Sequence, residues 1–503
     1  MTIPFRFACA AAAASLIACA AHAPPASPTP LGYDVVITGG RVVDGTGNPW
    51  FYGDVGIRGD RIAAIVSAGA LATAPAALRI DAHGRVVAPG FIDIQAQSYD
   101  AHLTGDGRVI SKIAQGVTTE ILGEGGTPAP ANSAMLAALL PADSLTRRAM
   151  LGFTGARGFG AWLNAMERHG SSVNVGSYLG AEVPRIFAKG YTEGPATPAQ
   201  LDTMRRVMRD AMRDGAFGLG SALIYPPGTY ASTAELAAMA EAMAPFHGTY
   251  ITHIRSEDDQ LFEAMDEAIA IGRQGGVPVE IYHLKAAARR NWSKAAAMVA
   301  KIDSARRAGQ DVGATMYPYP ASSNSLGACI PSWASAEGRL LANLRDAAMR
   351  ARVVREMSDT SAGANQGCQL DGPAVIMVVG LTRPELRKYE GWRLDRIAAD
   401  RGRPWTETLV DLVLAEDGRA GKMTSATASR LGLHDRGLLR QGMFADVVVF
   451  DPSTIADRAT YEQPHQLATG VDAVLVNGVA VWRNGFATGA FPGRALRGPG
   501  YVP

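Results

Sequence analysis

The sequence predicts an α/β fold in which a (β/α) barrel of the TIM type is joined to a small β-sandwich domain built from both ends of the chain. Three observations predict it. Apolar strands and helical segments alternate through the middle of the chain, as in parallel strands joined by helices. Short strands separated by Gly-containing turns occupy both ends. Glycine is abundant, at 56 of 503 residues, which suits a fold with many tight turns.

The β domain is predicted from hairpin patterns at the two ends of the chain. Its strands are expected at 34–37, 41–43, 54–57, 61–65, 446–450, 473–476 and 479–482. The last two are joined by Asn477-Gly478, the strongest two-residue hairpin signal. We assign 33–88 and 435–503 to this domain and 89–434 to the barrel.

The barrel pattern also predicts where chemistry is located. Strands are expected at 90–95, 117–124, 173–180, 217–223, 250–255, 279–285 and 311–317. Helices such as 198–214 and 234–244 lie between them. Catalytic residues of such barrels lie at the carboxyl ends of the strands. Polar side chains at the carboxyl ends of these strands are therefore the candidate catalytic and metal-binding residues.

Composition excludes several other classes of protein. Lys and Arg number 48 and Asp and Glu 47, so the net charge of +1 gives no basic surface for nucleic acid. No heptad or collagen repeat is present, and four cysteines are too few for a disulfide scaffold. No nucleic-acid partner is therefore expected.

The N-terminus reads as an export signal. Arg6 precedes an apolar run at 7–18 that is too short to span a bilayer. The run ends in Leu-Ile-Ala-Cys19, which resembles a lipoprotein processing site; the alternative is cleavage after Ala23, where Pro24 would hinder it. We assign residues 1–23 to the signal.

Residues 24–32 form a Pro-rich linker that follows this signal. We expect a periplasmic protein, lipid-anchored to a membrane through Cys19. That compartment permits a disulfide between Cys329 and Cys368, although two buried unpaired thiols explain them equally well.

Three metal-capable side chains stand at strand ends. His253 follows the strand that begins at 250, and His283 follows the next strand, 30 residues later. Glu124 lies in a Gly-rich turn after the strand at 117–122. Two imidazoles and a carboxylate suit Zn²⁺ with one position left for water. Zinc lowers the pKa of such a water, which can then attack a carbonyl.

Several motifs in one order resemble the metal-dependent amidohydrolase superfamily, and within it the N-acyl-D-amino-acid deacylase (D-aminoacylase) group. The motifs are VAPGFID at 87–93, QGVTT at 115–119, ITHIR at 251–255, GVPV at 276–279, YHLK at 282–285, MYPY at 316–319 and RQGMFADVVVFDP at 440–452. The resemblance covers nearly all of the chain after the signal. It implies a barrel with a flanking β domain and hydrolysis of an N-acyl amide bond.

The resemblance also implies roles for individual residues. His253 and His283 fall on family metal ligands, and Glu124 is the substitute where the family commonly has a cysteine. Lys285, Arg255 and Tyr317 fall where the family places substrate or transition-state contacts. The alternatives are a salt bridge for Arg255 and strand-end packing for Tyr317.

Two departures from the family pattern affect these expectations. Gln95 and Gln97 replace the His-x-His pair of a second metal position, so we expect one zinc per chain and a weak or lost second site. Between 421 and 422 the family carries several dozen more residues, including the eighth barrel strand and its proton-shuttling Asp. No acid follows the late strand at 375–379.

A barrel without its last strand has two unpaired edges, unless another strand of the chain or a partner chain in an oligomer closes it. A hydrolase without its proton shuttle needs another base or loses rate, commonly by about 10²- to 10⁴-fold. Two hypotheses follow: a metal-dependent hydrolase of non-peptide C–N bonds whose general base is unidentified, or an inactive periplasmic lipoprotein that keeps the scaffold and binds a ligand.

Overall fold

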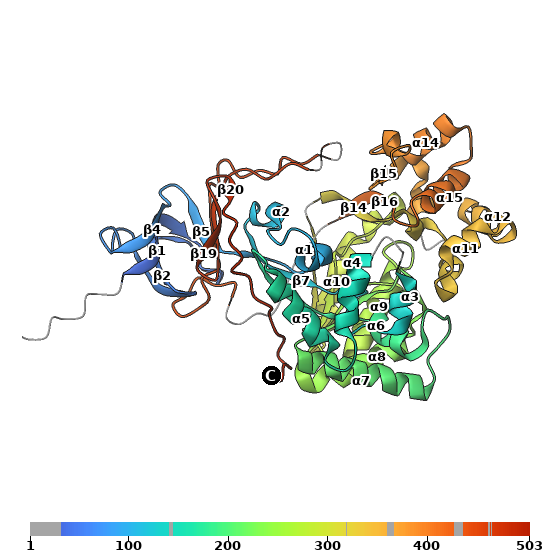
Figure 1. Ribbon diagram of the computed structural model, residues 1–503, viewed down its shortest axis with the longest axis horizontal. Coiled ribbons are helices and arrows are strands. Elements are labelled where there is room, and N and C mark those ends of the chain that lie inside the picture. The colour runs from blue at the N-terminus through green and yellow to red at the C-terminus, as the bar shows by residue number, and fades with distance from the viewer. Residues whose placement is uncertain are drawn as a thin grey trace, which may run out of the picture.

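The computed structural model describes residues 32–139, 144–317, 319–359, 367–426, 436–460, 463 and 465–503. The signal, its Cys19 and nearly all of the 24–32 linker lie outside them. The chain forms a β domain, a parallel-stranded barrel and a group of helices, α11 to α15 (Figure 1). Within the described ranges, none of the helices has the length and apolar character needed to cross a membrane.

The β domain is one hydrogen-bonded sheet built from both ends of the chain. Its strands are β1 (Tyr33–Val42), β2 (Phe51–Arg58), β3 (Arg61–Ser67), β4 (Ala76–Asp81), β5 (Val86–Pro89), β17 (Val447–Phe450), β18 (Val471–Val476), β19 (Val479–Arg483) and β20 (Phe486–Ala487). The antiparallel pair β5–β17 joins the two ends, and strands of both ends share one apolar core. The expected small β domain built from both ends of the chain is therefore present, as a single sheet.

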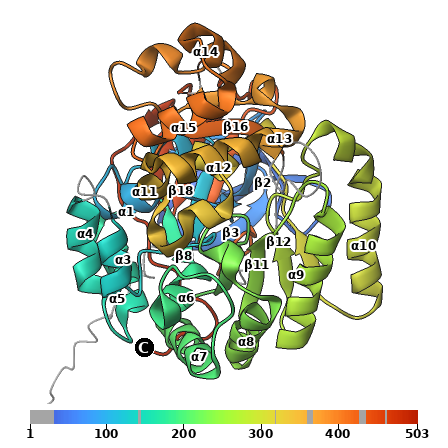
Figure 2. The ribbon, with the colours of Figure 1, turned by 90° about the vertical axis from the view of Figure 1, so that its right-hand side faces the viewer.

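The barrel strands are parallel to their neighbours. They are β6 (Phe91–Asp93), β7 (Val117–Leu122), β8 (Asn174–Ser177), β9 (Leu179–Gly180), β10 (Gly218–Ala222), β11 (Thr249–His253), β12 (Val279–Ile281) and β13 (Val312–Ala314). The helices around them are α1 (Tyr99–Leu103), α2 (Ile110–Ile113), α3 (Ser133–Ala138), α4 (Ser144–Met150), α5 (Gly158–His169), α6 (Glu182–Lys189), α7 (Pro198–Asp214), α8 (Thr233–Met243), α9 (Leu261–Gly275) and α10 (Ala295–Arg307) (Figure 2). The predicted fold class is confirmed.

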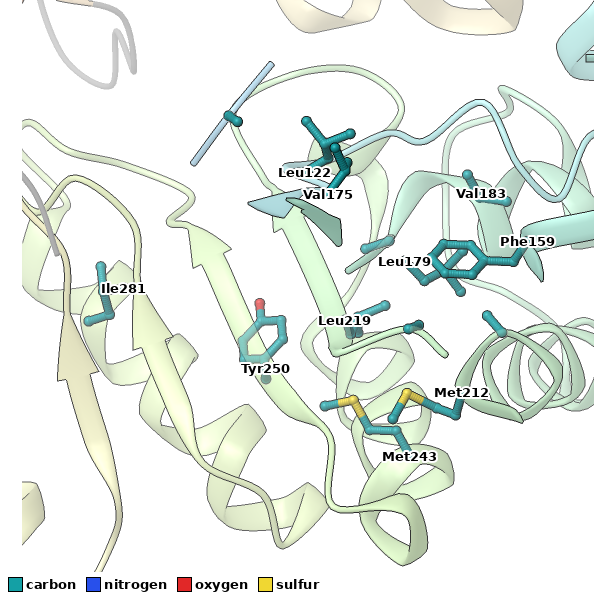
Figure 3. Close-up of a cluster of buried hydrophobic side chains, with 14 of the residues drawn as sticks. Leu122, Phe159, Val175, Leu179, Val183, Met212, Leu219, Met243, Tyr250 and Ile281 are labelled. Atoms are coloured by element: carbon teal, nitrogen blue, oxygen red, sulfur yellow. The ribbon is translucent and has the colours of Figure 1, made fainter. Parts of the chain in front are cut away.

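Strand alternation divides the barrel's side chains into two sets. Tyr250 and Ile281 belong to the large cluster that packs between strands and helices, and Met212 of α7 and Met243 of α8 belong to the same cluster (Figure 3). Ile251, one residue along β11, belongs to a separate cluster on the other side of the strands. Because side chains of a strand alternate with a period of two, His253 shares the side of Ile251.

The barrel is open at one place. Among the described residues, β13 pairs only with β12 and β6 only with β7, so seven strand positions are filled if β8 and β9 count as one interrupted strand. The late strand expected at 375–379 is β15 (Met377–Val379), and it pairs antiparallel to β16 (Gly421–Ala426) instead of joining the barrel. With β14 (Tyr319–Ser325) these strands form a separate small sheet.

The helices after β14 surround a second apolar core, next to this small sheet (Figure 2). They are α11 (Leu340–Arg345), α12 (Ala347–Ser358), α13 (Gly367–Asp371), α14 (Leu394–Arg401) and α15 (Trp405–Ala415). A disulfide joins Cys329 to Cys368, with their Cα atoms 5.7 Å apart, which settles the open question about these two residues.

Removing this disulfide is expected to destabilise the helical part of the chain. The bridge spans 39 residues, and closing a loop of that length in the unfolded chain contributes about 4 kcal/mol of stability in the chain-entropy model. A Cys329→Ser, Cys368→Ser variant should therefore unfold at lower temperature than the oxidised parent. Circular dichroism melts compare the two, with the reduced parent as the matched control. An unchanged transition contradicts the expectation.

Candidate metal centre

The three predicted ligand residues meet at the carboxyl ends of their strands. His253 is the last residue of β11, His283 lies two residues after β12, and Glu124 lies two residues after β7. Glu124 Oε1 is 2.9 Å from His253 Nδ1 and 3.3 Å from His283 Nε2, and those two nitrogens are 3.0 Å apart. Both histidines are buried. The three ligand atoms lie within 4.8 Å of one another.

Local backbone geometry directs two of these side chains. Gly123 has a φ of +112°, and a Cβ there would lie 2.4 Å from the carbonyl oxygen of Tyr178, so only glycine fits the turn before Glu124. His283 has a φ of +36°, and its N–H donates to Thr315 Oγ1 at 2.7 Å. A non-glycine residue in this region is strained by about 1–3 kcal/mol, which is common at functional sites.

Gln95 and Gln97 both point at the carboxylate of Glu124. Each donates from Nε2 to Glu124 Oε2 at 2.8 Å. The carboxylate therefore turns one oxygen to two amide donors and the other to the two histidines. Both glutamines are therefore hydrogen-bonded to a predicted metal ligand.

Electrostatics favours a charged carboxylate among the imidazoles. Burial opposes the ionisation of Glu124, but hydrogen bonds from His253 and His283 outweigh it, and the pKa of Glu124 lies well below its usual range. Burial lowers the pKa of His253. For His283, burial and the Lys285 charge are outweighed by the carboxylates, and its pKa is raised.

The donor set fits a metal ion. A carboxylate oxygen and two imidazole nitrogens converge in a buried position, and such N and O donors are typical of zinc. Glu124, His253 and His283 are the residues that would hold the ion.

A fourth residue, Glu257, belongs to this cluster and was missed by the sequence analysis. Its Oε1 lies 3.1 Å from His283 Nδ1 and 3.5 Å from His253 Nε2, and it accepts a hydrogen bond from Lys285 Nζ. Burial opposes its ionisation, but the charges of Lys285 and the histidines hold the pKa of Glu257 far below its usual range. The sequence offered one sign that Glu257 lies near the ligands: it follows His253 by four residues, in the loop after the same strand.

Lys285 and Tyr317 lie beside the cluster. Lys285 Nζ is 2.9 Å from His283 Nδ1 and 5.9 Å from the ring centre of Tyr317. The rings of His283 and Tyr317 are 6.2 Å apart. These two predicted contact residues are therefore brought together with the ligands.

Arg255 forms a salt bridge, one of the two alternatives that the sequence left open for it. Its Nε and Nη2 each donate to Glu267 at 2.8 Å, and Nη1 and Nη2 donate to the carbonyl oxygens of Thr229 and Ala231 at 2.9 and 2.8 Å. All three guanidinium nitrogens are occupied, so Arg255 anchors a loop to α9. The salt-bridge alternative is the one that the structure supports.

Lys422, on β16, was also missed. It is buried, and its charge interacts with those of Glu257 and Lys285. Burial, together with the Lys285 charge, lowers the pKa of Lys422 to about 8. Its sequence position, outside the pattern of barrel strands, gave no sign that the antiparallel strand β16 brings its charge within reach of Glu257 and Lys285.

Glu182, the first residue of α6, is a further carboxyl near the site. Its oxygens lie against the Gly125-Gly126 turn, where a Cβ would come within 3.1 and 3.2 Å of them. Burial and the charge of Glu124 raise the pKa of Glu182 to about 8. The carboxyl is therefore neutral around pH 7, and the two glycines leave the space that it occupies.

Comparison with known proteins agrees with this geometry. The chain is 34% identical to an N-acyl-D-glutamate deacylase of Alcaligenes xylosoxydans, over 92% of this chain and 96% of the relative. No family model matches it.

Two solved structures share its fold at a TM-score of 0.73. One is a D-aminoacylase with a binuclear metal centre, for which one-metal activation and second-metal attenuation are described; it is 27% identical, over 92% of this chain and all of that one. The other is an N-acyl-D-glutamate deacylase of Bordetella bronchiseptica with zinc and a phosphonate inhibitor. It is 28% identical, over 93% of this chain and all of that one. By the extent of these matches, the chain belongs to the N-acyl-D-amino-acid deacylase family of amidohydrolases.

Proposed function

We propose that this protein hydrolyses the amide bond of N-acyl-D-amino acids in a metal-dependent reaction. The observation that carries the proposal is the convergence of Glu124, His253 and His283 in a chain of the deacylase family. The similarity to deacylases of N-acyl-D-glutamate supports a small N-acyl amino acid as the substrate.

The metal is zinc, at one ion per chain. Zinc, when bound, activates water and polarises a carbonyl group. Support for a single ion comes from Gln95 and Gln97, whose amide N–H groups occupy Glu124 Oε2. A second ion would need imidazole ligands at positions 95 and 97. The neutral glutamine amides that stand there are weak zinc ligands.

The substrate carboxylate is recognised by positive charge and a phenol at the barrel mouth. Lys285 and Lys422 provide two ammonium groups near one another, and Tyr317 lies beside Lys285. Opposite charges attract strongly in such a buried site. Binding at this end aligns the neighbouring amide with the ligand cluster.

Replacing Lys422 by methionine is expected to raise KM about 10- to 100-fold with little change in kcat, because one charged hydrogen bond to the carboxylate is lost. The parent's KM should also rise as the pH passes about 8, since Lys422 then loses its proton. Steady-state kinetics between pH 6.5 and 9.5 measure both effects.

Lys422→Arg should keep a low KM above pH 8. Lys388→Met, at an exposed lysine, is the control. An unchanged KM in Lys422→Met removes Lys422 from the site.

The alternative is a ligand-binding protein without turnover. One observation favours it: in the described part of the barrel no strand follows β13, so the family's acid at the end of strand eight has no counterpart there. Turnover by the purified protein excludes this alternative.

The proposal is tested by turnover with and without metal. The purified mature protein, loaded with zinc, is assayed against N-acetylated D- and L-amino acids with acidic, neutral and basic side chains. We expect hydrolysis of at least one D-substrate, lost on chelation and restored by zinc. No hydrolysis of any member of the panel, with zinc bound, favours the ligand-binding alternative.

We also propose that the protein is exported to the periplasm and lipid-anchored through Cys19. The apolar run before Cys19 and the Pro-rich segment after it support this location. Radiolabelled palmitate should label the parent in cells, and Cys19→Ala should abolish the label while leaving the Cys329–Cys368 disulfide intact. Equal labelling of both refutes the anchor.

A further inference from the structure

We propose that Glu257 is a positioning residue that fixes which nitrogen of His283 carries the proton. The inference rests on the proposed metal centre. It assigns a task to a carboxylate that belongs to neither the ligand set nor the substrate contacts.

One oxygen of Glu257 faces the outer nitrogens of both rings. His283 Nδ1 lies 3.1 Å from Glu257 Oε1, and His253 Nε2 lies 3.5 Å from the same oxygen. The other nitrogen of each ring, His283 Nε2 and His253 Nδ1, faces Glu124. The two histidines thus lie between two carboxylates: Glu124, on the side of the ligand cluster, and Glu257, on the opposite side.

This arrangement decides the tautomer. A neutral imidazole carries one N–H, and a carboxylate can only accept it. When His283 donates its N–H from Nδ1 to Glu257 Oε1, 3.1 Å away, its Nε2 presents a lone pair, as a metal ligand requires. Histidine ligands of metals commonly donate their second N–H to a carboxylate in this way.

Lys285 makes the assignment depend on Glu257. Its ammonium donates to Glu257 and also lies 2.9 Å from His283 Nδ1. An ammonium has donors only, so without the carboxylate it would donate to Nδ1 and drive the proton of His283 to Nε2. That tautomer cannot bind a metal through Nε2. Glu257 prevents it by accepting from both groups.

His253 is oriented by the other carboxylate. Its Nδ1 lies 2.9 Å from Glu124 Oε1, whereas its buried Nε2 is 3.5 Å from Glu257 Oε1 and has no hydrogen-bond partner in the described structure. The tautomer that depends on Glu257 is therefore that of His283.

The test compares Glu257→Gln, Glu257→Asp and Lys285→Met, with Glu263→Gln, at an exposed residue of α9, as the control. Zinc affinity is measured by competition with a chromogenic chelator. Histidine tautomers are read from ¹⁵N shifts of the metal-free proteins.

We expect Glu257→Gln to weaken zinc binding about 10- to 100-fold, in the range found for carboxylates behind metal ligands, and to move the proton of His283 to Nε2. Glu257→Asp should restore part of the affinity. Lys285→Met should keep zinc affinity and the Nδ1–H tautomer, because Glu257 remains. Parental zinc affinity and tautomers in a folded Glu257→Gln protein overturn the proposal.

The tautomer readout needs neither turnover nor metal. If the parent proves inactive, the proposed function fails, but the ¹⁵N comparison still decides the role of Glu257. If the parent is active and the tautomers do not change, the function stands and this inference fails.

Discussion

His283→Ala is expected to lower kcat/KM about 10³-fold or more and to reduce zinc content well below one ion per chain. The histidine supplies one of three protein ligands, and the ion contributes several kcal/mol of transition-state stabilisation, at about 1.4 kcal/mol per tenfold in rate. Removing Nε2 also leaves Glu124 Oε1 with one fewer partner. Steady-state kinetics and elemental analysis of the same preparation measure both effects.

His465→Ala is the matched control, since this histidine is exposed. It should match the parent in both measurements. A His283→Ala protein that remains folded and hydrolyses its substrate at the parental rate removes His283 from the centre.

The Gln95→His, Gln97→His double variant is expected to bind a second zinc ion. In the parent, both amides donate to Glu124 Oε2, and this oxygen is the one turned away from the histidine pair. Two imidazoles at these positions would supply nitrogen ligands beside the freed oxygen, and nitrogen ligands hold zinc far better than neutral amides do. Zinc content should rise from about one to about two ions per chain.

Elemental analysis after removal of loosely bound ions gives the stoichiometry. Gln115→His, at an exposed glutamine, controls for adventitious binding by a new histidine. If the double variant stays at one ion, the glutamines are not what prevents a second site.

The position of the ligand set could be predicted because it follows from strand geometry. His253 and His283 end neighbouring parallel strands, and such ends meet at one rim of a barrel. Glu124 followed from the same rule, since its strand also ends there. The Cys329–Cys368 pairing could not be predicted, because a sequence does not give the separation of two Cα atoms.

Other features depended on side-chain directions that no pattern records. Arg255 is two residues from His253, yet its guanidinium turns to Glu267 on α9. Glu257 lies in an irregular loop, where no period of two or 3.6 predicts which side it faces. The strand at 375–379 was predicted, but its antiparallel partner β16, and with it Lys422, comes from a sheet that the barrel pattern does not contain.

Whether Glu124, His253 and His283 form a working metal centre is decided by the zinc content of the purified mature protein, measured together with its turnover of an N-acyl-D-amino acid. We expect about one zinc ion per chain, held by these three residues, and hydrolysis that disappears on chelation. A protein that binds no metal, or that hydrolyses the substrate equally well without it, contradicts the metal-dependent function.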